Sequence, residues 1–173
     1  MEVVVSRFDE DSVRHLPGAA QAAAAGRGKA LEVAGRYPGR HVLGADTVVW
    51  DGEAALGKPQ DAADAARMLA RLAGREHTVF SAAYLVTPSG DVQEVVAEAR
   101  VAIDALTAAE VAAYVASGEA FDKAGAYAIQ GLAGSFAHLR AGHRDTVIGL
   151  PTQALRPLLE AAGFRLSANL DQP

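Results

Sequence analysis

The chain has 173 residues, half of them hydrophobic, and this length suits one domain with a substantial core. Its formal net charge of −5 argues against binding to a nucleic-acid polymer, which needs a basic face, and the absence of cysteine excludes a disulfide framework and a cysteine-based zinc site. No apolar run approaches the roughly 18 residues of a membrane span, and the N-terminus lacks a signal pattern. We therefore expect a cytoplasmic protein with no membrane partner.

The first half of the chain predicts, in order, a short β run at residues 1–6, an acidic turn at 7–11, a helix at about 18–36, a buried strand at 41–50 and a helix near 61–72. In the last of these, Ala65, Met68, Leu69 and Leu72 recur at helical spacing, and Gly74 follows as the stop.

The second half predicts two β runs, at about 77–87 and 92–106, joined by a turn sequence at 88–91. Thr107 and Glu110 form a capping box that opens a short helix, and residues 121–134 are Gly-rich and irregular. A strand at 135–141 and a helix that begins near Pro151 follow. This order of strands and helices indicates an α/β or α+β protein with one central sheet.

The basic residues are divided unevenly between thirteen arginines and three lysines, Lys29, Lys58 and Lys123. A lysine ammonium group is a compact point charge that suits phosphate oxygens, whereas arginine serves wherever a solvated cation suffices in this chain. Chance explains any single lysine as well as function does. The three together favour lysines that bind an anionic ligand.

Asp46 lies in the middle of an apolar strand, beside a Gly-Ala pair that permits close approach of another group. One interpretation is a carboxylate hydrogen-bonded to the backbone, and the sharper one is a metal ligand or general base. Glu10, in an acidic turn, is a candidate second carboxylate. Mg²⁺ is typically held by one or two carboxylates together with substrate phosphates, and this pair matches that need.

Other familiar motifs are absent. Gly28-Lys29 lacks the remaining residues of a P-loop, and the chain contains neither GxGxxG nor GxSxG. The five histidines show no metal-ligand spacing. These absences leave the lysines and carboxylates as the candidates for chemistry.

Five segments taken together resemble the Maf family in order and approximate spacing. They are GKA at 28–30, GADTVV at 44–49, GKP at 57–59, FDKAGAYAIQG at 121–131 and VIGLP at 147–151. The similarity extends from about residue 3 to residue 163. An unrelated α/β domain with a structural Asp46 would require five coincidences.

The resemblance implies a single Maf-like domain over residues 1–173, with the α/β fold of this family: an elongated mixed sheet flanked by helices, similar to the ITPase type, with a nucleotide cleft. It implies a hydrolase of nucleotide metabolism, with a house-cleaning role, that converts a nucleoside triphosphate to the monophosphate and pyrophosphate. A divalent cation, Mg²⁺ or Mn²⁺, is the implied cofactor. Both a monomer and a homodimer stay open.

The resemblance also assigns roles to individual residues. Asp46 falls at the family's proposed proton acceptor and, with Glu10, at the metal site. Substrate-binding positions fall on Lys29, Thr47, Lys58, Lys123 and Gln130. A threonine after the aspartate is similar to the branch that acts on dTTP and UTP. The amide of Gln130, at the family's specificity position, offers the donor and acceptors that pairing with a pyrimidine edge requires.

The start of the chain departs from the family pattern. Family members open with a strand and a Ser-x-Ser-Pro-Arg-Arg loop before the segment that matches residues 3–11, and those arginines bind phosphate. We therefore expect a chain that is N-terminally truncated relative to the family. The alternative to an active pyrophosphatase is a catalytically impaired relative that binds a nucleotide or a protein.

Overall fold

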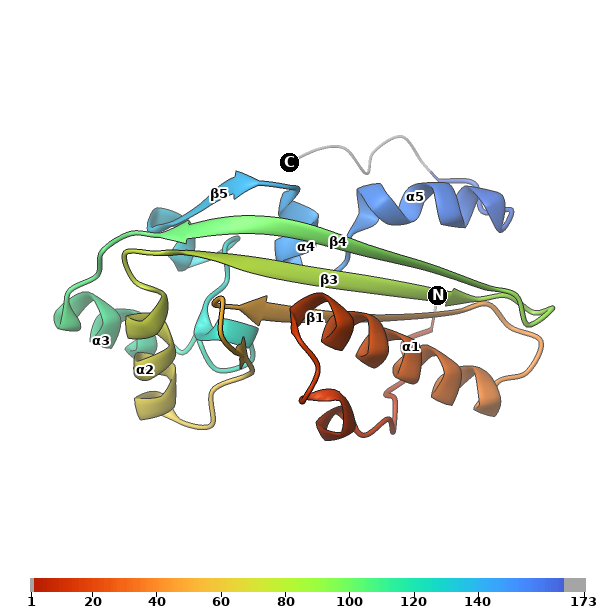
Figure 1. Ribbon diagram of the computed structural model, residues 1–173, viewed down its shortest axis with the longest axis horizontal. Helices are drawn as coiled ribbons and strands as arrows, with labels where there is room; N and C mark the ends of the chain where they lie inside the picture. Colours follow the sequence, from red (N-terminus) through yellow and green to blue (C-terminus); the bar gives the residue numbers. More distant parts are fainter. Residues whose placement is uncertain (1, 167–173) are drawn as a thin grey trace.

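A computed structural model describes residues 2–166, which form a five-stranded sheet flanked by helices (Figure 1). The strands are β1 (Val42–Trp50), β2 (Ala55–Leu56), β3 (Glu76–Val86), β4 (Val92–Ile103) and β5 (Ala137–Ala141), in the spatial order β2-β1-β3-β4-β5. All four ladders are antiparallel, and a single isolated bridge, between Ala73 and Ile103, is parallel. The predicted α/β class with one central sheet is confirmed, although the ladders between its strands are antiparallel instead of mixed.

The helices lie on both faces of this sheet. They are η1 (Glu10–Val13), α1 (Gly18–Arg36), α2 (Ala62–Leu72), α3 (Ala108–Ala116), η2 (Ala124–Ala126), η3 (Leu132–Ser135), α4 (Arg144–Ile148) and α5 (Thr152–Ala161). Since successive strand residues point to opposite faces, neighbouring positions of β1 pack against different helices. Val48 packs with Ala22 of α1, whereas Val49 packs in a separate cluster with α2 and α3.

The core contains one large cluster and two small ones. The large cluster joins Leu69 and Leu72 of α2 to Val79 and Val101 of the sheet and to Tyr114 of α3. Burial of each such side chain stabilises the fold by about 1.5–3 kcal/mol. The predicted capping box of α3 is present, with the Thr107 side chain accepting from Glu110 N and the Glu110 carboxylate accepting from Thr107 N.

Close packing of α1 on β1 explains the Ala- and Gly-rich sequence of this helix. A Cβ atom on Gly44 of β1 would lie 2.6 Å from both Ala30 N and Gly26 O. Gly26, on the facing side of the helix, lies close enough that its added Cβ would be 3.6 Å from Asp46 N. The two backbones therefore approach each other directly, and this contact brings the Lys29 turn of α1 alongside Asp46.

The β run expected at residues 1–6 is wrong for the described part, because residues 2–9 form no strand; Met1 lies outside the described residues. This segment lies along α1 instead, where Ser6 Oγ and Arg7 N both donate to Glu32 and Arg36 Nη2 donates to Val5 O. Val3 and Val5 are exposed, so no apolar surface draws the segment into the sheet.

Five short elements went unpredicted: β2, α4 and the short helices η1, η2 and η3. Each is five residues or fewer, too short for a hydrophobic period to show in the sequence. None of the helices within residues 2–166 combines the length and apolar character needed to cross a membrane.

Candidate active site

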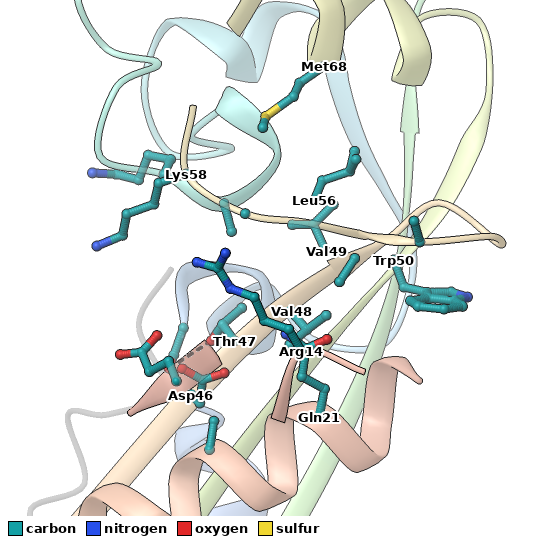
Figure 2. A pocket seen from close by; sticks show the side chains of 18 of the residues that line it. Arg14, Gln21, Asp46, Thr47, Val48, Val49, Trp50, Leu56, Lys58 and Met68 are labelled. Atoms are coloured by element: carbon teal, nitrogen blue, oxygen red, sulfur yellow. Dashed lines mark hydrogen bonds between the residues drawn. The ribbon is translucent and has the colours of Figure 1, made fainter. Parts of the chain in front are cut away.

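A cleft of about 1020 Å³ opens beside β1, between α1 with η1 on one side and the loops around residues 57–58 and 122–124 on the other (Figure 2). Its lining includes six of the seven residues singled out from the sequence: Glu10, Lys29, Asp46, Thr47, Lys58 and Lys123. These six come from distant parts of the chain, so the fold brings them together. Gln130 is exposed and lies outside this lining, so its role in substrate binding stays a prediction.

Lys29 links the two candidate carboxylates. Its Nζ atom lies 2.6 Å from Asp46 Oδ1 and 2.9 Å from Glu10 Oε1. The side chains of Lys29 and Asp46 are only 22% and 14% exposed, whereas that of Glu10 is 57% exposed. A helix, a strand and a turn thus meet at one ammonium group, next to the close contact of α1 with β1.

Burial and charge act in opposite directions on this cluster. Burial raises the pKa of the Asp46 carboxyl above its ordinary value, and the hydrogen bond from Lys29 offsets that rise only in part. Burial also opposes the charge on Lys29, but its hydrogen bonds to Asp46 and Glu10 outweigh that cost and raise its pKa. Lys29 therefore keeps its positive charge, and Asp46 is a more basic carboxylate than an exposed aspartate.

The opposite side of the cleft carries the other two lysines on loops. Lys58 follows β2, and Lys123 pairs with the neighbouring Asp122 at 2.6 Å, where this contact lowers the pKa of the Asp122 carboxyl. Gly125 N donates to Gly57 O at 3.1 Å and ties the two loops together. All three lysines of the chain therefore line the same cleft, as expected if they bind one anionic ligand.

Arg14 lines the cleft as well, although no sequence motif singles it out. In Figure 2 its guanidinium group projects into the cleft, and its Nε atom pairs with Asp11 Oδ1 at 2.9 Å. Of the thirteen arginines, all within residues 2–166, it alone lines the cleft. Its position four residues after Glu10 is the only signal in the sequence, because η1 turns both side chains toward the same space.

Tyr127 lines the cleft from the irregular segment that follows α3 and is anchored by a buried histidine. The His77 Nε2 atom of β3 lies 2.8 Å from Tyr127 Oη, and the two rings meet edge to face. Burial lowers the pKa of His77 to about 4, so its ring is neutral at pH 7. The pair fastens the loop side of the cleft to the sheet.

Together these groups suit a phosphorylated anion. Three lysines and one arginine supply positive charge, and two carboxylates that meet at one ammonium group supply oxygen ligands. Within residues 2–166 no group of three or more His, Cys, Asp or Glu side chains gathers as a metal cage. A cation at Glu10 and Asp46 would thus need further ligands, which a bound phosphate and water provide.

The fold and this cleft define an α/β protein in which lysines and carboxylates line one cleft. Residues 1–162 match the family Maf, described as Maf-like protein, and the chain belongs to that family.

Several relatives are similar along most of their length, and each is named dTTP/UTP pyrophosphatase. The protein from Myxococcus xanthus is 44% identical over 165 residues, which cover 94% of this chain and 83% of that protein. The one from Moorella thermoacetica is 45% identical over 161 residues, which cover 91% of this chain and 82% of that protein. The one from Sphingopyxis alaskensis is 46% identical over 140 residues, which cover 81% of this chain and 73% of that protein.

Among solved structures, a nucleoside-triphosphatase / dITP/XTP pyrophosphatase from Mycobacterium abscessus is 18% identical, with 94% of this chain and 74% of that chain covered. Its TM-score of 0.36 is too low to carry structural conclusions.

Proposed function

We propose that this protein is a nucleoside triphosphate pyrophosphatase that acts on dTTP and UTP and works in the cytoplasm, where free nucleotides are found. The observation that carries the proposal is the meeting of all three lysines with Glu10 and Asp46 in one cleft. The names of relatives about 45% identical support the reaction and the substrates. The products are the nucleoside monophosphate and pyrophosphate.

The two sides of the cleft divide the reaction between them. Lys58 and Lys123 neutralise charge on the triphosphate and on the pyrophosphate that leaves. Asp46 accepts a proton from the attacking water while the α–β phosphoanhydride bond breaks.

Glu10 and Asp46 would hold a divalent cation, Mg²⁺ or Mn²⁺, which when bound neutralises phosphate charge and activates water. The donor set fits, because both groups are carboxylates and each pairs with Lys29 through a single oxygen. Lys29 competes with the cation for these two groups. Lys29→Met should therefore bind Mn²⁺ more tightly than the unaltered protein in the absence of nucleotide, by about tenfold for one charge-assisted contact removed. Calorimetric titration with Mn²⁺ alone measures this; equal or weaker binding would move the metal site elsewhere.

The test of the proposed function is a panel of nucleoside triphosphates at equal concentration with Mg²⁺ or Mn²⁺. We expect release of pyrophosphate and monophosphate, fastest from dTTP and UTP. Release of inorganic phosphate instead would show cleavage at another bond, and preference for purine triphosphates would reject the proposed substrates. Nucleotide binding without turnover would favour the catalytically impaired relative.

A further inference from the structure

Beneath the cleft, a chain of hydroxyl groups joins the middle of the sheet to α4. Ser81 of β3 is completely buried, and its hydroxyl donates to Thr146 O at 2.6 Å. The same Ser81 oxygen lies 2.6 Å from Thr47 Oγ1, directly across the β1–β3 ladder. Thr47 in turn lines the cleft and is labelled in Figure 2.

Each hydroxyl group has one proton to donate, and this determines the direction of the hydrogen bonds among Thr47, Ser81 and Thr146. A carbonyl oxygen has no proton, so the only proton of Ser81 goes to Thr146 O. The proton shared between Thr47 and Ser81 must then come from Thr47. The alternative acceptor for Thr47, Gly149 O, is more distant at 3.2 Å. Thr47 therefore turns its proton away from the cleft and offers a ligand only its lone pairs.

Gly149 adds a second acceptor at the same place. Its carbonyl oxygen lies beside Thr47 Oγ1, and Gly149 also lines the cleft. The backbone of Gly149 has φ 122°, in the left-handed region that favours glycine, and an added Cβ would lie 3.4 Å from Thr47 Oγ1. Thr47 Oγ1 and the neighbouring Gly149 O are both acceptors, and both residues line this part of the cleft.

We propose that Ser81 is a positioning residue that fixes the Thr47 hydroxyl as a hydrogen-bond acceptor, so that this part of the cleft selects substrates that present a donor. The inference rests on the proposed function and deepens it. The imide N3–H of uracil and thymine is such a donor, whereas N3 of cytosine is an acceptor and meets the Thr47 acceptor unfavourably. A sugar hydroxyl is the other donor on the same substrates.

The experiment measures kcat/KM for UTP, CTP, N3-methyl-UTP and 3′-deoxy-UTP. The unaltered protein should prefer UTP to CTP by at least about tenfold, the usual effect of one unmatched buried polar contact. Ser81→Ala removes the nearer acceptor of the Thr47 proton, which can then turn to the ligand or to Gly149 O, so the preference for UTP over CTP should fall several-fold. In a Thr47→Val background, Ser81→Ala should no longer change that preference, which a merely structural role of Ser81 would not produce. Ser89→Ala, which removes an exposed hydroxyl in the β3–β4 turn, is the matched control.

The outcomes show whether the base or the sugar supplies the donor, and they distinguish failure of this inference from failure of the proposed function. If Ser81→Ala and Thr47→Val alter discrimination against N3-methyl-UTP, the base supplies the donor; if they alter only that against 3′-deoxy-UTP, the sugar does. A preference unchanged in both variants overturns the inference. Should Ser81→Ala fail to fold, Ser81→Cys and Thr47→Val decide the same question. If the unaltered protein hydrolyses no triphosphate, the proposed function fails, and the ratio of UMP to CMP binding still tests the acceptor arrangement.

Discussion

On the side of the cleft formed by α1 and β1, Lys29 is partly buried and held between two carboxylates. On the opposite side, Lys58 and Lys123 are carried by loops, and the ammonium group of Lys123 pairs with its exposed neighbour Asp122. The first side is preorganised, because its groups already contact one another and two of them, Lys29 and Asp46, are largely buried. The second can adjust to a ligand at the cost of ordering its side chains. The comparison suggests that chemistry depends on the first side and capture of substrate on the second.

The largest effect is expected from Asp46→Asn on the preorganised side. Loss of the charge that accepts a proton or holds a cation should lower kcat by about 10²–10⁴-fold. The melting temperature should hardly change, because burial already disfavours the charged carboxylate. Asp104→Asn, at an exposed carboxylate paired with His138 outside the cleft, is the control. Near-normal turnover of Asp46→Asn would assign the carboxylate a structural role.

The buried His77, which pairs with Tyr127 on the loop side of the cleft, should make the stability of the fold depend on pH. His77 has a folded pKa of about 4 against an ordinary value of 6.5, so the unfolded chain takes up a proton that the folded protein refuses. Stability contributed by neutral His77 is complete above pH 6.5 and is lost as pH falls toward 4, by up to about 3 kcal/mol.

Denaturant unfolding at pH 7 and pH 4.5 checks this, with His77→Gln as the variant that cannot titrate. The difference in the free energy of unfolding between pH 7 and pH 4.5 should be smaller in His77→Gln. It should persist in His143→Gln, which alters an exposed histidine. An undiminished pH dependence in His77→Gln would trace it to other groups.

Lys58→Ala sharpens the contrast between the two sides. Loss of one charge-assisted contact to phosphate should raise KM about tenfold with a smaller change in kcat. Lys29→Ala should mainly lower kcat, since it disturbs Asp46 directly. Arg75→Ala removes an exposed cation outside the cleft and serves as the control. If Lys58→Ala and Lys29→Ala changed KM and kcat in the same proportions, the proposed difference between the two sides of the cleft would be wrong.

The smallest effect is expected from Gln130→Ala. The side chain is exposed and outside the lining of the cleft, so kcat/KM for UTP should change by less than about threefold, within the range of a single weak contact. Steady-state kinetics with UTP and CTP measure it. A loss beyond tenfold with altered base preference would show that this amide reaches the substrate, as its sequence position suggests.

Much of the fold follows from local patterns in the sequence. The helix at 18–36 and the capping box at Thr107 were predicted with correct bounds or partners, because caps and helical periods are local signals. Residues 1–6 show the limit of such patterns: three consecutive valines favour a strand, but a strand also needs a neighbour to pair with. The antiparallel ladders depend on that same non-local pairing.

The cleft was predictable where a residue type conflicts with its surroundings. Asp46 is a charge within an apolar strand, and the lysines are rare among the basic residues. Arg14 and Ser81 carry no such conflict: one looks like a solvated turn residue and the other like an ordinary strand serine. The importance of Ser81 arises from Thr146, 65 positions later in the chain, and only the packing of α4 on β3 reveals it.

The contact of Gly44 with Gly26 and Ala30 has a consequence for how the sequence can change over evolutionary time. Because main-chain atoms set the spacing of α1 from β1, the distance between Lys29 and Asp46 does not depend on the volume of the surrounding core side chains. Core positions can therefore exchange one aliphatic residue for another while the ion pair keeps its geometry. Gly44 itself has no such freedom: even alanine would push the helix outward, and the geometry of Lys29 and Asp46 would change through a residue that lies outside the lining of the cleft.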